Sequence, residues 1–351
     1  MTDKSPDANA PRNGLAGRIA VTLGVIALMR LLAVIPLPGL NPGMSENYAG
    51  AVERVSLLSL NITPWLSAVI LAEAAILILP LEWTRWLRHR GHADPFAPAV
   101  LIFTLAVAAF QSVGISIALE SIPNAIPEPG LESRLGAAAS LTGATAVMIA
   151  GARLIQKRGI GHGFWVLWSL LAVFDFRDSV SQLADAGKQG LLSLPAVLTL
   201  AGCLAASFAI VIFVLQARRR AGLAAAAPLI WPIPVCLTVL PWLSAGADFA
   251  FGDGNRFLNA VMPDRSPGFA VFALAMTGTA LIYGRRENHI SLAFAGAGAL
   301  IAVLALSYAP GALFTPGGGH FVPGPLLQAY FVPLAASLGL ALRQDFSREK
   351  G

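Results

Sequence analysis

A few side chains in this sequence are of types that could do chemistry, but their spacing does not support a reaction. His89 and His92 are spaced like metal ligands, and Asp94 follows closely. No cysteine or further histidine lies near them, and a loop rich in arginine is a poor site for a cation. We find no Ser/His/Asp arrangement and no pair of carboxylates within an apolar segment. The sequence therefore predicts no metal, no cofactor and no enzymatic activity.

A glycine-rich stretch runs from Gly159 to Gly163 and has the composition of a phosphate-binding loop. It lacks the lysine of such loops, and no predicted strand precedes it. Nucleotide binding is therefore not expected there.

Two ionisable residues lie inside long apolar stretches, Arg30 in the first and Glu73 in the second. A lone charge at the middle of a bilayer costs about 2.5–3.5 kcal/mol, so each should face protein or water. Their depths differ by roughly 6 Å at 1.5 Å per helical residue, which an arginine side chain can span. We hypothesise an Arg30–Glu73 ion pair. In the alternative, Arg30 reaches the outer interface while Glu73 is protonated or lines a cavity.

The segments that must hold these residues are long and apolar. Hydrophobic residues make up 56% of the chain and charged residues 12%, about half the proportion of soluble proteins. At about twenty residues per span, ten membrane helices are predicted. They cover residues 19–37, 62–80, 97–119, 135–155, 161–174, 190–216, 228–244, 267–283, 290–308 and 323–342.

The fifth and seventh spans are short or interrupted, the seventh by Pro232, Pro234 and Pro241. Freed backbone groups in such helices need protein neighbours or a water-filled cavity. Weak spans near the middle of the chain indicate a pathway between inverted halves. The alternative is that these spans are ordinary kinked helices.

Basic residues set the orientation. Of the 24 lysines and arginines, 17 fall in six clusters between pairs of spans or at the ends, which predicts ten spans with both termini cytoplasmic. The net charge of +5 is thereby explained without nucleic acid. The predicted organisation is a disordered cytoplasmic tail (1–17), an N-terminal half (18–174), an external loop (175–189), a C-terminal half (190–342) and a second cytoplasmic tail (343–351).

Several motifs together resemble the SecY family, the central subunit of the general protein translocase. They are the stretches 30–39, 59–68, 110–115, 141–143 and 155–163, the last with the sequence Ile-Gln-Lys-Arg-Gly-Ile-Gly-His-Gly. The resemblance extends over residues 18–342 and is strong as far as residue 163. It implies an all-α fold of ten helices in two inverted five-helix halves around a pore.

By this resemblance, a ring of apolar side chains would seal the pore, because a narrow apolar constriction loses its water. The positions that match the ring are Ile62, Leu66, Trp168, Cys236 and either Leu327 or Gln328. Tryptophan, cysteine and glutamine are unlike the usual isoleucines of that ring. For Ile62 and Leu66, simple helix packing is the alternative.

The cytoplasmic loops depart from the family. SecY proteins carry two long loops that dock the ribosome or the SecA motor, and here these shrink to residues 218–227 and 285–289. Five arginines remain there as candidate partner contacts, namely Arg218, Arg219, Arg220, Arg285 and Arg286. A specific interface needs about 20–30 residues on each side. We therefore expect no stable complex with ribosomes or SecA.

The resemblance predicts a specialised protein-conducting channel or insertase in the bacterial cytoplasmic membrane. Its substrates would be unfolded polypeptides or short apolar segments, and its partners membrane lipid and a small SecE-like subunit. The alternative is a membrane scaffold or small-molecule carrier that retains the fold without translocation.

Overall fold

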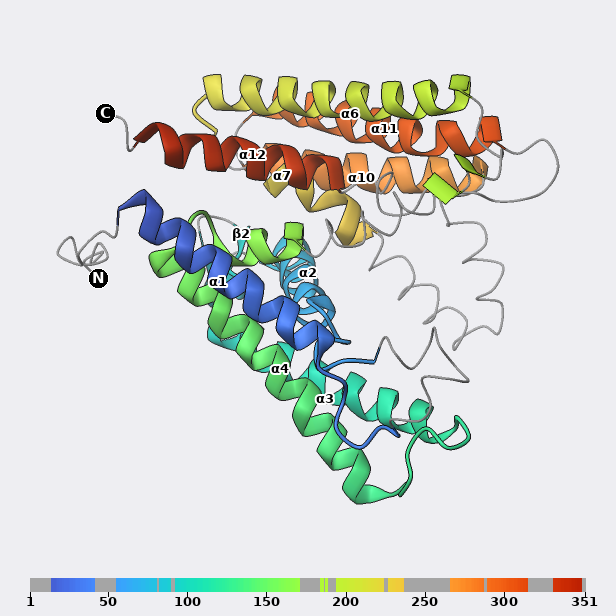
Figure 1. The fold of residues 1–351 in the computed structure, drawn as a ribbon. Coiled ribbons are helices and arrows are strands. Elements are labelled where there is room, and N and C mark those ends of the chain that lie inside the picture. The colour runs from blue at the N-terminus through green and yellow to red at the C-terminus, as the bar shows by residue number, and fades with distance from the viewer. Residues whose placement is uncertain are drawn as a thin grey trace, which may run out of the picture. The chain divides into compact units, whose positions relative to one another are not determined.

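The computed structural model describes residues 14–41, 55–80, 82–89, 92–170, 184–185, 187–188, 194–223, 227–236, 266–286, 289–314 and 331–348. Within these ranges most residues are α-helical (Figure 1). The chain forms two compact units. The first unit consists of Met1–Pro64, Leu105–Trp168 and Leu340–Gly351, and the second of Trp65–Thr104 and Ser169–Gly339.

The helices follow the predicted spans closely. They are α1 (Leu15–Val34), α2 (Thr63–Ile78), α3 (Pro98–Glu120), α4 (Leu131–Arg158), α6 (Leu194–Arg220), α7 (Ala227–Ile230), α10 (Ser266–Arg286), α11 (Ile290–Phe314) and α12 (Phe331–Arg348). Residues 163–170 and 232–236 are also helical. Of the predicted tails and external loop, the structure describes residues 14–17, 184–185, 187–188 and 343–348, and the last of these ranges continues α12.

The loop after α2 holds the small amount of other structure. It contains a 3-10 helix, η2 (Arg85–Leu87), and the strands β1 (Arg88–His89) and β2 (His92–Ala93). The strands pair antiparallel, with His89 opposite His92.

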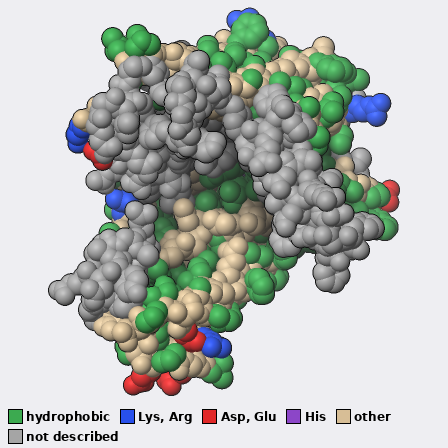
Figure 2. Space-filling model, turned by 90° about the vertical axis from the view of Figure 1, so that its right-hand side faces the viewer, with side chains coloured by type: hydrophobic (Ala, Val, Ile, Leu, Met, Phe, Trp, Pro, Cys, Tyr) green, Lys and Arg blue, Asp and Glu red, His purple; other side chains and the backbone are tan. Residues whose placement is uncertain are grey.

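Five described helices are long and apolar enough to cross a membrane, namely α1, α3, α4, α6 and α11, while α2 and α10 are shorter apolar helices. Their outer faces carry large hydrophobic side chains, such as Phe110 (82% exposed) and Phe213 (72% exposed). Hydrophobic side chains are spread over much of the described surface in Figure 2. Such surfaces suit lipid, so the chain is a multi-pass membrane protein. The count of ten spans stays a prediction.

In the first unit, α1 packs along α4 (Figure 1). The contact is close because Gly151 of α4 has no side chain, and a Cβ there would lie 2.9 Å from a methyl group of Val25. A hydrophobic cluster of small and aliphatic residues, some of them from α3 and α4, lies in the same unit. Its buried members are Leu37, Leu60, Ala108, Leu119, Ala137 and Leu141.

In the second unit, α11 packs against both α6 and α10 (Figure 1). The connection between α10 and α11 is tight. The His289 amide donates to the Gly284 carbonyl at 3.0 Å, and a Cβ on Gly284 would lie 2.1 Å from that of Ala293. Glycine is therefore required where the two helices meet.

The predicted break in the seventh span is confirmed. α7 ends at Ile230, and the helix resumes at residue 232 after a bend at Trp231. Pro232 accounts for this, since proline disfavours the helical conformation of the residue before it.

Candidate functional site

The candidate pore residues near α2 sit at the start of that helix. Asn61 adopts a left-handed conformation, with φ of 52°, and its side-chain oxygen accepts a hydrogen bond of 2.8 Å from the Ile62 amide. Ile62 is buried in the first unit, and Leu66 is half-buried in the first turn of α2, in the second unit. Asparagine tolerates the left-handed conformation better than most residues, which explains why it precedes the helix.

Trp168 belongs to an aromatic cluster in the first unit. Its ring stacks on that of Trp165, with centroids 5.5 Å apart and planes at 24°. Phe164 completes the cluster at 5.9 Å from Trp168. Trp168 is buried, so this bulky side chain is fixed by its neighbours on the same helix.

Cys236 is buried in the second unit, with its sulfur 3.8 Å from the hydroxyl of Thr279 on α10. The Thr279 hydroxyl already donates to the Ala275 carbonyl at 2.8 Å. A hydroxyl has one proton, so the thiol is the donor between these two groups. Leu327 and Gln328 lie outside the described residues. The ring of five therefore stays a prediction, since its described members are divided between the two units.

The carboxylate of Glu73 lies at the centre of a polar network in the second unit. The residue is 0% exposed in α2. One oxygen accepts a hydrogen bond of 2.6 Å from the Ala93 amide of β2, and the other accepts one from the hydroxyl of Tyr283 on α10. Buried carboxylates need such donors to offset the loss of water. The predicted Arg30–Glu73 pair would join different units and stays a prediction.

The loop after α2 is folded back onto that helix. The indole nitrogen of Trp65 donates to the Pro95 carbonyl at 2.9 Å, and its ring meets Phe96 edge-on at 5.3 Å. Together with the Glu73–Ala93 bond, this holds the hairpin against α2. No group of three or more potential metal ligands was found among the described residues, and the side chains of His89 and His92 lie outside the description.

The glycine-rich stretch forms a tight turn between α4 and the following helix. A Cβ on Gly163 would lie 1.8 Å from the carbonyl oxygen of Ala152, so the two backbones are in direct contact. Gly161 has φ of 75°. At the other end of the turn, the Gly159 carbonyl accepts a hydrogen bond of 3.0 Å from the Arg18 side chain. These glycines serve close helix packing.

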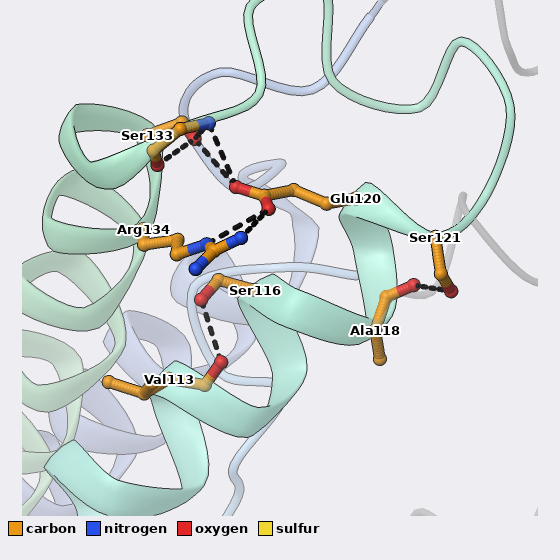
Figure 3. A network of polar contacts seen from close by, with 8 residues as sticks. Val113, Ser116, Ala118, Glu120, Ser121, Ser133 and Arg134 are labelled. Carbon is orange, nitrogen blue, oxygen red and sulfur yellow. Dashed lines mark hydrogen bonds and ion pairs between the residues drawn. The ribbon is translucent and has the colours of Figure 1, made fainter.

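A second carboxylate, Glu120, lies at the end of α3 (Figure 3). One of its oxygens accepts hydrogen bonds of 2.9 Å and 2.6 Å from the Arg134 guanidinium, and the other accepts from Ser133 and the Gly130 amide. Both Glu120 and Arg134 lie outside the predicted spans 97–119 and 135–155. The hydrogen bond from Arg134 lowers the pKa of Glu120.

The five arginines predicted as candidate partner contacts have different environments. Arg218 is 2% exposed, whereas Arg220 and Arg285 are exposed, Arg219 is intermediate, and the side chain of Arg286 lies outside the description. The Leu223 amide donates to the Arg218 carbonyl at 2.9 Å across Gly222, whose φ is 79°. This glycine turn ends α6 sharply.

Comparison with solved structures identifies the fold. "The structure of a protein conducting channel" aligns with a TM-score of 0.56 at 10% identity, over 99% of this chain and 96% of that one. "Sec61 in the Canine ribosome-channel complex from the endoplasmic reticulum" gives a TM-score of 0.56 at 12% identity, with the same coverage. The fold is that of the protein-conducting channels.

The sequence matches are to the SecY family. The SecY family model matches residues 56–228. The protein translocase subunit SecY of Helicobacter pylori is 24% identical over 227 residues, covering 59% of this chain and 54% of the relative. That of Escherichia coli K12 is 24% identical over 225 residues, covering 59% and 51%. Over these residues the chain is similar to the SecY family, as its motifs indicated, and its matches span about half the length of these relatives. The family consists of channel proteins, not enzymes.

Proposed function

We propose that this protein is a specialised SecY-like channel or insertase for unfolded or short apolar polypeptides in the bacterial cytoplasmic membrane. The observation that carries the proposal is the combination of the channel fold with very short connections. The link from α6 to α7 comprises residues 221–226, and that from α10 to α11 comprises residues 287–289. A core of this fold can hold a pore, while connections of this length offer little surface to a large motor.

In this proposal, apolar side chains at the start of α2 and in the helices that complete the ring seal the pore. Ile62→Gly or Leu66→Gly should raise ion leakage through reconstituted vesicles, because a wider apolar constriction holds water. Unchanged conductance in both variants would assign these residues to helix packing instead.

Translocation itself is tested by trapping a substrate. A polypeptide stalled during insertion should crosslink to a photoreactive group at Ile62 and to none at Phe110, which is exposed on α3. The absence of a crosslink at Ile62, with the substrate inserted normally, would favour the scaffold or carrier. Trp168 is buried at a position that matches the pore ring, where the family usually has isoleucine, and this bulky side chain favours the scaffold or carrier.

Membrane orientation follows from the basic clusters, with both termini cytoplasmic. Reporters fused after residue 125 and after residue 220 should report outside and inside, respectively. The reverse result at either position would overturn this orientation. A small SecE-like subunit should co-purify from membranes in mild detergent.

Ribosomes and SecA should not co-purify in stoichiometric amounts at roughly 0.15 M salt, the physiological ionic strength. Arg218 is buried, so the charge available to a partner at the end of α6 comes from Arg219 and Arg220. Such surface charges attract weakly and are screened by salt. Stable co-purification would restore a conventional motor-driven translocase.

A further inference from the structure

Two tryptophans in the loop after α2 face outward, in contrast to the other tryptophans that the structure describes. Trp83 is 69% exposed and Trp86 is 62% exposed. Trp65, Trp168 and Trp231 are buried and Trp165 is half-buried. Two large aromatic side chains in this loop are therefore exposed, and a contiguous exposed apolar surface is typical of an interaction site.

The local fold fixes this exposure. Thr84 and Leu87 alternate with the two tryptophans and are buried. The Leu87 amide donates to the Thr84 carbonyl at 3.0 Å, and the Leu87 carbonyl accepts from the Asp94 amide at 2.9 Å. The inward residues thus hold η2 in place, and Trp83 and Trp86 necessarily point away from the interior.

The two tryptophans are also joined to each other. The indole nitrogen of Trp86 donates to the backbone carbonyl of Trp83 at 2.8 Å. The hairpin that follows is held against α2 by the Glu73–Ala93 and Trp65–Pro95 hydrogen bonds. The exposed pair is therefore a surface on a well-anchored loop.

This surface continues from the apolar end of α2. Ile78 and Leu79, at the end of that helix, are exposed, and Arg85 stands exposed between the two tryptophans. Tryptophan concentrates at the level of the lipid headgroups because its ring is apolar and its N–H is polar. An arginine at that level attracts anionic lipids.

We propose that Trp83, Arg85 and Trp86 form a membrane-interface site that binds the headgroup and upper acyl chain of an anionic phospholipid. The tryptophan rings supply apolar contact at the interface, and the Arg85 guanidinium pairs with the phosphate. Lipid is favoured over a protein partner because the surface is continuous with a helix whose outer face is already apolar. Glu82 is also exposed here and opposes the attraction.

The test uses purified protein in phosphatidylcholine vesicles that contain a minority of phosphatidylglycerol. The fluorescence of Trp83 and Trp86 is the difference between the wild type and the W83F/W86F double variant. Lipids brominated near the headgroup end of the acyl chain should quench this fluorescence. Lipids brominated near the chain terminus should quench it less. A W165F variant serves as the control, since it removes a half-buried tryptophan from a different helix. Phenylalanine at the exposed positions preserves the fold, which thermal unfolding will verify.

Lipid selectivity is measured by placing the bromine on phosphatidylglycerol or on phosphatidylcholine in otherwise identical vesicles. The anionic lipid should quench Trp83 and Trp86 more strongly. R85Q should lower this preference by up to about 5-fold, because an arginine near an anionic membrane surface contributes roughly 1 kcal/mol of attraction. E82Q should raise it.

Three results would overturn the proposal. Quenching by aqueous iodide with none by brominated lipid would place the tryptophans in water. Protection from both quenchers would mean that protein, such as a second copy of this chain, covers them. Equal quenching by both lipids in the wild type and R85Q would remove the anionic specificity.

Discussion

Gly163 in the first unit and Glu73 in the second each join segments that are distant in sequence, but they do so by different means. Gly163 has no side chain, and this lets its helix approach the carbonyl oxygen of Ala152 in α4. Glu73 instead contributes a carboxylate that accepts hydrogen bonds from the Ala93 amide and the Tyr283 hydroxyl. The first contact is steric and the second is polar.

The difference shows which substitutions each contact tolerates. The glycine contact fails when any side chain is added, whatever its polarity, because the obstacle is the backbone of α4. The Glu73 contact fails when an acceptor is removed, because two buried donors then lose their partner. The fold is therefore sensitive to side-chain volume at Gly163 and to hydrogen bonding at Glu73.

The largest effect is expected for Glu73→Ala. This change leaves the Ala93 amide and the Tyr283 hydroxyl without their acceptor, at a cost of about 1–3 kcal/mol for each buried group. Tyr283→Phe should cost less, about 1–3 kcal/mol in all, because only one oxygen of the buried carboxylate then loses its donor. Thermal unfolding in detergent, followed by tryptophan fluorescence, measures both. Equal midpoints for Glu73→Ala and the wild type would show that the network does not stabilise the second unit.

A somewhat smaller effect is expected for Gly163→Ala. The added methyl group would overlap the Ala152 carbonyl, and relieving such overpacking costs about 1–3 kcal/mol. Gly143→Ala is the matched control in α4, since a Cβ there meets nothing within 4 Å. The same unfolding measurement applies. If both alanine variants unfold at the same temperature, the close backbone contact is not what holds the turn.

The smallest effect is expected at Glu120. Its hydrogen bond from Arg134 lowers the pKa of the carboxyl, so the ion pair stabilises the protein above the unfolded pKa of about 4.3. That contribution is lost as pH falls through the lower pKa of the folded state. Glu120→Gln should therefore flatten the dependence of the unfolding midpoint on acid pH, whereas Glu128→Gln, at an exposed position, should not. An unchanged profile in the Glu120 variant would rule out this contribution.

Hydrophobic length and proline positions were enough to predict where the described helices lie, whereas the SecY-like fold was predicted from the family resemblance. α2 runs from Thr63 to Ile78 where the sequence predicted 62–80, and the bend before Pro232 was expected. α4 extends to Leu131 and Arg158, beyond the predicted 135–155, because polar residues at its ends are still helical and hydropathy does not detect them.

The contacts of the polar residues were harder to predict from the sequence. The burial of a charge within an apolar segment predicted that Glu73 needs a partner, but not that Tyr283, 210 residues away, supplies it. A tyrosine in an apolar helix gives no periodic signal that distinguishes a hydrogen-bond donor from a packing residue. Likewise, a cluster of arginines predicted a basic surface at the end of α6, although Arg218 is buried.

The junction between α1 and the glycine turn has a consequence for the order of events during synthesis. The Arg18 side chain meets the Gly159 carbonyl, and Thr22 accepts from the Ile160 amide, across 141 and 138 residues of sequence. At about 5–20 residues per second, a ribosome needs roughly 7–30 s to make the intervening chain. The contacts that fix α1 against the glycine turn can therefore form only after α4 has been made.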